Sequence, residues 1–155
     1  MYGSVRAPTF HFVLLKAITV AGRRINVLAS VFAAGAIIDS GTVITRLPPT
    51  AYRALRTAFR AEMKMYPPAR SQSILDTCFN LTGVGHVKLP RVALVFDRGA
   101  AMELHPAGIL QYECLAFASS SDDKAIGIIG NVQQRTFEVL YDVRGGAVGF
   151  RRSAC

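Results

Sequence analysis

The chain has 155 residues, of which 51% are hydrophobic and 18% charged, and this predicts a single domain able to bury a core. No segment approaches the ~20 uninterrupted apolar residues of a membrane span, so we expect no membrane partner. The formal net charge of +8 raises the question of nucleic acid. Most basic residues are scattered singly, without interleaved aromatic residues, which argues against a nucleic-acid partner.

The first predicted element is a β-hairpin near the N-terminus. Residues 10–20 are rich in aromatic and β-branched side chains, and a turn at 21–24 leads toward a second strand at 25–27. Residues 1–10 contain no apolar core of the signal-peptide type. We therefore expect either a chain that is intracellular as written or the downstream piece of a longer protein.

A tight turn, Asp39-Ser40-Gly41-Thr42, follows between two apolar, β-branched runs. Asp is depleted in strands and rarely buried without partners, so the Asp39 carboxylate needs nearby donors. Ser40 and Thr42 supply hydroxyl groups, and Gly41 allows a close approach of the backbone. An ordinary hairpin turn is the alternative interpretation of an isolated Asp-Ser-Gly. The apolar flanks and the pattern downstream favour a functional carboxylate.

One helix is predicted after Pro48-Pro49, and Pro67-Pro68 closes its region before a polar loop at 69–76. The apolar residues of this helix recur at spacings of three, four and four, which indicates a core-facing stripe. They are Tyr52, Leu55, Phe59 and Met63. Another face carries Arg53, Arg56, Arg60 and Lys64. We interpret this basic face as solvated rather than as a nucleic-acid stripe.

Short strand-like runs make up the C-terminal half, separated by clusters of Gly, Pro, Asp and Ser. The runs are 92–96, 101–104, 114–117, 125–129, 136–141 and 147–150. The chain is therefore predicted to be mostly β. No linker divides it, and no internal repeat has a fixed period.

The three cysteines, Cys78, Cys114 and Cys155, lack the paired Cys-x-x-Cys spacing of a zinc site, so we expect no metal. Cys78 and Cys114 could join two parts of the fold in an oxidising compartment, which would leave Cys155 as an odd thiol. A glycosylation sequon at 80–82 adds a little weight to secretion. Ser40 lacks the Gly-x-Ser-x-Gly setting of a serine nucleophile, and the three histidines suggest no catalytic triad.

A second apolar pattern lies far downstream of the Asp39 turn. Ile128-Ile129-Gly130 is followed by a short turn and a strand that ends in Tyr141-Asp142. The combination resembles the C-terminal lobe of the plant nepenthesin-like aspartic proteases, a group that includes the xylanase-inhibitor relatives. Further segments that match this pattern are 38–48, 75–79 and 148–150. The resemblance covers the chain from about Thr9 to Cys155.

The resemblance implies a fold and a set of roles. The fold is mostly β: residues 1–155 would form a single C-terminal lobe of the bilobal pepsin-like acid protease fold, with one main helix and short helical turns. Asp39 would be one of two catalytic aspartates. Ser40 would bond across to the other lobe, while the backbone N–H of Gly41 and the hydroxyl of Thr42 would hold the carboxylate. Ile129 and Gly130 would lie on the strand that passes behind this turn.

The resemblance also implies a chemistry and a setting. Two neighbouring carboxylates share one proton, and the ionised one activates a water molecule by general base catalysis, without a cofactor. The substrate would be a peptide or protein in an extended conformation. Cys78 and Cys114 would form a disulfide within the lobe. Full-length relatives would be extracellular or located in plastids.

The second aspartate is missing from this sequence, because none of the other aspartates begins a Ser/Thr-Gly-Ser/Thr turn. These are Asp76, Asp97, Asp122, Asp123 and Asp142. We therefore expect a missing N-terminal lobe or a second chain to supply it, and we expect this chain alone to be inactive. An alternative hypothesis is a symmetric dimer, in which each of two chains supplies its own Asp39.

Three other functions remain open at this point. One is a noncatalytic binding protein like the xylanase inhibitors, and another is an inactive truncated lobe. The third is DNA binding, motivated only by the net charge and by nucleoid-associated relatives in the family.

Overall fold

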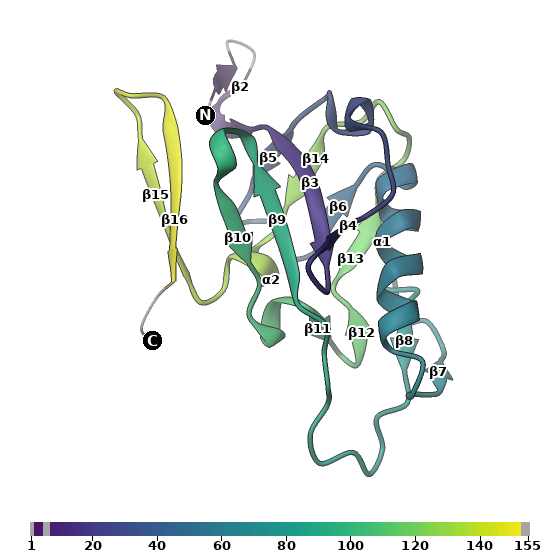
Figure 1. Ribbon diagram of the computed structural model, residues 1–155. Helices are drawn as coiled ribbons and strands as arrows, with labels where there is room; N and C mark the ends of the chain where they lie inside the picture. Colours follow the sequence, from purple (N-terminus) through teal and green to yellow (C-terminus); the bar gives the residue numbers. More distant parts are fainter. Residues whose placement is uncertain (1, 5–6, 153–155) are drawn as a thin grey trace.

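The computed structural model describes residues 2–4 and 7–152 and confirms a mostly β lobe with one main helix (Figure 1). The largest sheet has six strands in the order β1-β2-β5-β14-β6-β13. Their bounds are β1 Tyr2–Ser4, β2 Ala7–Val13, β5 Ala36–Ile38, β14 Gly127–Ile129, β6 Thr45–Leu47 and β13 Phe117–Ser119. This sheet carries the Asp39 turn, which lies between β5 and β6.

A second sheet has four strands in the order β10-β9-β3-β4. Their bounds are β10 Ala101–Glu103, β9 Val92–Phe96, β3 Leu15–Val20 and β4 Arg23–Arg24. The predicted hairpin is present, but its second strand is β4 at 23–24 and not 25–27, because the chain already reverses at Ala21 and Gly22, both with positive φ. The single strand predicted for residues 10–20 is wrong in one respect: it breaks at Leu14, so that β2 and β3 belong to different sheets.

Two smaller sheets complete the β structure. One has four short strands, β11 Leu110–Gln111, β12 Cys114–Leu115, β8 Cys78–Phe79 and β7 Pro68–Ala69. The other is a hairpin of β15 Phe137–Asp142 and β16 Ala147–Arg152. The run predicted at 114–117 is divided at Ala116, whose N–H donates to the carbonyl of Ile109, so β12 and β13 join different sheets.

The long helix α1, Pro49–Glu62, confirms the helical prediction. The predicted stripe of Tyr52, Leu55, Phe59 and Met63 is buried, and the helix contacts β3 and β13. The other helical segments are a single turn α2, Asn131–Gln134, and three short 3₁₀ segments, η1 Ala29–Phe32, η2 Asp97–Gly99 and η3 Pro106–Gly108. Within residues 2–4 and 7–152, no helix is long and apolar enough to cross a membrane.

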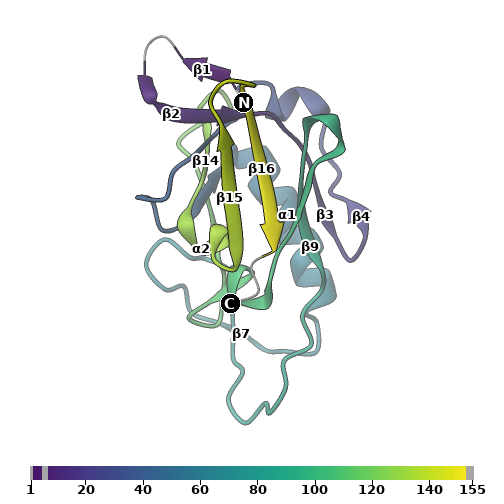
Figure 2. The same cartoon turned by 90° about the vertical axis from the view of Figure 1, so that its left-hand side faces the viewer.

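The β15–β16 hairpin lies on the side of the molecule opposite to α1, as the two perpendicular views show (Figures 1 and 2). It is attached to the rest of the lobe through aromatic and aliphatic contacts. The Phe150 ring stacks on Phe96 with their centroids 5.1 Å apart, and Phe137 and Val148 pack against the main core. One continuous hydrophobic core therefore extends from α1 to the base of this hairpin.

Candidate active site

The Asp39 turn is built where a distant strand enters between two neighbours. β5 ends at Ile38 and β6 begins at Thr45, and β14 lies between them in the sheet. β14 runs parallel to β5, with Ile129 beside Ile38, and antiparallel to β6, with Ile128 beside Arg46. The turn from 39 to 44 therefore has to cross the end of β14.

Two donors hold the Asp39 carboxylate. The backbone N–H of Gly41 donates to Oδ1 at 2.9 Å, and the Thr42 hydroxyl donates to Oδ2 at 2.6 Å. These two bonds, the Thr42 bond first, hold the pKa of Asp39 below its ordinary value. The side chain is only half-buried, so the ionised carboxylate keeps free lone pairs on the solvent side.

The strand behind the turn fixes its backbone. The Asp39 N–H donates to the carbonyl of Ile129 at 3.1 Å, and the Asn131 N–H donates to the carbonyl of Thr42 at 2.7 Å. Gly130 lies at the crossing, where a Cβ atom would stand only 2.6 Å from the carbonyl oxygen of Val43. Only glycine fits this contact, because real Cβ atoms do not approach an oxygen so closely.

The structure brings Asp39, Ser40, Gly41 and Thr42 together with Ile129 and Gly130. Ser40 is exposed at the tip of the turn, and its carbonyl accepts a hydrogen bond of 3.1 Å from the Asn131 side chain. The predicted bond from Ser40 to another lobe stays a prediction.

The two disulfide cysteines belong to the small sheet and share a buried cluster with the end of the Asp39 turn. Cys78 on β8 pairs with Cys114 on β12, and the predicted disulfide joins them. Both residues are buried in a small cluster with Leu75, Ala116 and other apolar side chains. The disulfide therefore joins β8 to β12 and packs in the same cluster as Ile44, the last residue of the turn, and Val132 on α2.

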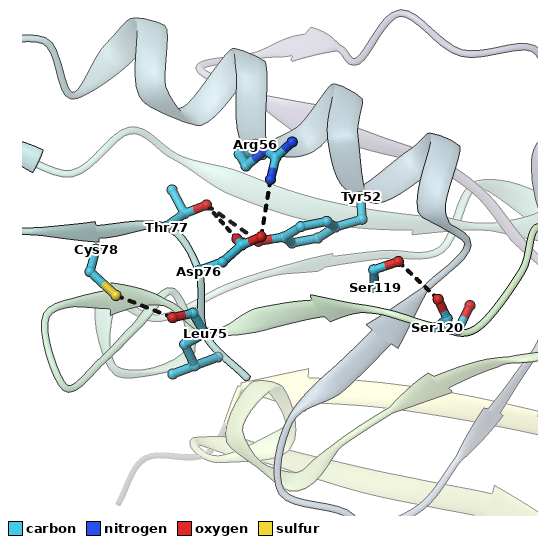
Figure 3. A network of polar contacts seen from close by, with 8 residues as sticks. All are labelled: Tyr52, Arg56, Leu75, Asp76, Thr77, Cys78, Ser119 and Ser120. Atoms are coloured by element: carbon cyan, nitrogen blue, oxygen red, sulfur yellow. Dashed lines mark hydrogen bonds and ion pairs between the residues drawn. The ribbon is translucent and has the colours of Figure 1, made fainter. Parts of the chain in front are cut away.

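Three other aspartates have structural partners. Asp76 accepts hydrogen bonds from Tyr52 and Thr77 and forms an ion pair with Arg56 (Figure 3). Asp123 accepts from the backbone N–H and the hydroxyl of Thr50, at the start of α1. Asp142 accepts from the N–H of Gly145 in the turn between β15 and β16. Each of these carboxylates stabilises a local element.

Several polar residues around the turn escaped the sequence analysis, namely Thr45, Asn131, Gln133 and Gln134. Asn131 bonds the tip of the turn, and Gln134 donates to the carbonyls of Ile129 and Gly130. Thr45 and Gln133 are completely buried behind it. A usable signal was present: three amide side chains follow Gly130 within four residues, in a segment that is otherwise apolar.

The arrangement can hold an ionised carboxylate at the solvent-exposed side of the turn, where its free lone pairs can accept a hydrogen bond from a water molecule. Such a group can orient water and accept a proton from it. Among the residues that the structure describes, no three His, Cys, Asp or Glu side chains gather as a metal-binding group.

Comparisons with known proteins place the chain in a family. Residues 10–152 match the family model described as xylanase inhibitor C-terminal. The chain is 50% identical over 153 residues to an aspartyl protease family protein of Arabidopsis thaliana, covering 95% of this chain and 32% of that protein. It is 37% identical over 160 residues to aspartic proteinase nepenthesin-2 of Nepenthes gracilis, covering 96% of this chain and 36% of that protein. The chain thus spans about a third of the length of these relatives.

Solved structures agree on the fold. The crystal structure of edgp superposes with a TM-score of 0.80 at 18% identity, covering 92% of this chain and 39% of that one. Basic 7S globulin from soybean gives a TM-score of 0.71 at 23% identity, covering 89% and 36%. At these identities the likeness speaks for the shared fold alone.

Proposed function

The chain belongs to the xylanase inhibitor C-terminal family and corresponds to the C-terminal lobe of plant pepsin-like aspartic proteases. We propose that it forms one lobe of an aspartic endopeptidase, in which Asp39 is one of the two catalytic carboxylates. The observation that carries the proposal is the Asp39 carboxylate itself. Each of its oxygens accepts one bond, from Gly41 or Thr42, and the side chain remains open to solvent.

The two hydrogen bonds suit Asp39 to the role of a base. Hydrogen bonds to the charged form lower the pKa of a carboxyl group, so Asp39 stays ionised in mildly acidic solution. A second carboxylate close by would retain a proton, because two like charges cannot both be stable at short distance. In the proposed reaction the ionised carboxylate takes a proton from water, and the protonated carboxyl donates a hydrogen bond to the scissile carbonyl.

The second carboxylate must come from outside these 155 residues, since the sequence contains one Asp-Ser-Gly-Thr turn. We assign it to an N-terminal lobe or to a second chain. A peptide or protein substrate would lie extended between the two halves. The Cys78–Cys114 disulfide supports an oxidising location for the protein, with the extracellular space preferred over the plastid.

The test is to supply the missing lobe. The matching third of the Arabidopsis aspartyl protease family protein is replaced by this chain, and cleavage of denatured globin is followed against pH with and without pepstatin. We expect acid-dependent, pepstatin-sensitive cleavage that Asp39→Asn abolishes, and no cleavage by the 155-residue chain alone. Cleavage by the chimera that survives Asp39→Asn would overturn the catalytic role of Asp39.

A noncatalytic binding role is the second candidate, and the description of the matching family as xylanase inhibitors favours it. The same chimera separates the two. A correctly folded chimera that cleaves nothing, while the unmodified Arabidopsis protein cleaves globin, would favour binding over catalysis.

A further inference from the structure

Behind the Asp39 turn lies a small polar network that is fully enclosed in the core. Thr45, the first residue of β6, and Gln133 on α2 both have 0% of their surface exposed. Buried polar side chains are costly unless every donor and acceptor is paired, so a complete network in this position calls for an explanation.

The Gln133 amide is fully paired. Its Nε2 donates to the carbonyl of Gly108 at 2.9 Å and to the carbonyl of Ala116 at 2.8 Å, while its Oε1 accepts from the Thr45 hydroxyl at 2.5 Å. Two carbonyl acceptors at one end determine the orientation of the amide, because a flipped amide would place its oxygen against them. The oxygen is therefore held in place as an acceptor for Thr45.

Thr45 connects the fixed Gln133 amide to the peptide group between Ile129 and Gly130. Its hydroxyl oxygen accepts a hydrogen bond of 2.9 Å from the N–H of Gly130. The carbonyl of the same peptide group, that of Ile129, accepts the N–H of Asp39 at 3.1 Å. A peptide group is planar and rigid, so its N–H and C=O ends cannot move independently.

We infer that Thr45 and Gln133 are positioning residues for Asp39: they hold the Ile129–Gly130 peptide plane from the core side, and the opposite end of that plane fixes the backbone of the turn. This inference rests on the proposed function for its meaning, because a positioned carboxylate matters most where it does chemistry. The geometry itself depends on the five hydrogen bonds and the shared peptide group.

Removing the Thr45 hydroxyl breaks the network at its centre. Valine has nearly the same shape as threonine, so Thr45→Val leaves little empty space. It does remove the hydrogen-bond partner of both the Gly130 N–H and the Gln133 side-chain oxygen. The peptide plane then tilts to recover a partner, and the Asp39 backbone moves with it. The donors of Gly41 and Thr42 become misaligned with the carboxylate.

The experiment measures the pKa of the Asp39 carboxyl in the 155-residue chain by carbon-detected NMR titration. Three variants are compared: Thr45→Val, Thr45→Ser and Thr77→Val. Thr77 is an equally suitable site for a control, because it is buried, hydrogen-bonds through its hydroxyl and belongs to the Tyr52–Asp76 network instead. We expect Thr45→Val to raise the Asp39 pKa toward its ordinary value. Thr45→Ser should keep the native pKa because serine retains the hydroxyl, and Thr77→Val should leave the Asp39 pKa unchanged.

An Asp39 pKa that is the same in Thr45→Val and in the native chain would overturn the inference, and so would an equal rise in Thr77→Val, which would indicate a general loss of stability. If Thr45→Val does not fold, Gln133→Met tests the same network, because it removes the acceptor of the Thr45 hydroxyl. It should raise the Asp39 pKa in the same way. The titration is independent of proteolysis. A chimera without protease activity would therefore refute the proposed function while leaving the positioning role intact.

Discussion

The hydroxyl of Thr42 lies 2.6 Å from Oδ2 of Asp39, and it is the strongest single influence on the protonation of that carboxyl group. The donor and the acceptor belong to the same turn, three positions apart. Their geometry therefore depends on the turn being closed correctly by the strand behind it, and this dependence leads to the first two predictions.

Replacing Thr42 by Val should raise the pKa of Asp39, because the charged form loses its principal donor while the Gly41 N–H remains. A carboxyl group with a lowered folded-state pKa adds stability at pH above its unfolded value of 3.8, and this stability is lost as the pH falls through the folded pKa. Thr42→Val should therefore weaken the fall in stability on the acid side. Urea unfolding measured between about pH 5 and about pH 2 checks the slope.

Thr42→Ser is the matched control, because serine keeps the hydroxyl. It should keep both the Asp39 pKa and the acid slope close to native. An unchanged pKa in Thr42→Val would show that the hydroxyl does not bond the carboxylate in solution.

Substituting Gly130 by Ala should disrupt the turn from behind. The added Cβ would lie 2.6 Å from the carbonyl oxygen of Val43, and no side-chain rotation can relieve this contact, because the Cβ position is fixed by its own backbone and the oxygen belongs to the backbone of Val43. We expect a loss of about 3 kcal/mol in unfolding free energy, the upper end for overpacking of a core. Urea denaturation provides the measurement. Gly85→Ala is the control, because a Cβ there meets nothing within 4 Å, and it should be nearly neutral.

The contrast between Gly130 and Thr45 shows what the sequence could and could not predict. Gly130 was identified because two apolar residues and a glycine far downstream of an Asp-Ser-Gly-Thr turn form a local pattern that resembles a known family. Thr45 looked like an ordinary β-branched residue in a strand, and Gln133 like a polar residue in a turn. Their roles depend on hydrogen bonds between residues 88 positions apart, which only the folded chain brings together.

The strand breaks follow the same rule. Residues 10–20 carry a continuous strand signal, yet the chain leaves one sheet and enters another at Leu14. The backbone N–H of Asp97 donates to the Leu14 carbonyl, so the break is set by a partner more than 80 residues away. Helix α1, in contrast, was predictable because its apolar stripe and its prolines are local signals.

Tyr52 and Asp76 connect α1 to the segment before β8 (Figure 3). Burial is the largest cause that raises the Tyr52 pKa to about 12, and the hydrogen bond to Asp76 adds to it. Burial alone would raise the pKa of Asp76, but the bonds from Tyr52 and Thr77 and the charge of Arg56 outweigh it, and the net pKa is lowered. The pair is thus built from a neutral phenol and an ionised carboxylate.

Tyr52→Phe should remove this bond and lower the free energy of unfolding by about 1–2 kcal/mol, a range that allows for the partial exposure of Asp76. Because the Tyr52 pKa is raised on folding, its contribution is fully present below pH 10 and is lost as the pH rises toward about 12. The native chain should therefore lose more stability across that window than Tyr52→Phe does. Denaturation in urea at both ends of the window checks this, and equal losses in the two chains would contradict it.

Asp123 caps α1 from a loop 73 positions away, accepting both the N–H of Thr50 at 2.8 Å and its hydroxyl at 2.6 Å. The residue before the helix is Pro48, whose side chain accepts no hydrogen bond from the helix. Asp123 instead accepts the Thr50 N–H, which has no partner within the helix, and places a negative charge at the positive end of the helix. Asp123→Ala should lower the melting temperature, and the difference from native should shrink as the pH falls through the lowered Asp123 pKa.

The matched control is Asp122→Ala, which changes the net charge equally but removes only a local bond to the Lys124 N–H. It should leave the melting temperature nearly unchanged, and equal losses in the two variants would mean that charge alone, and not the cap, stabilises the helix.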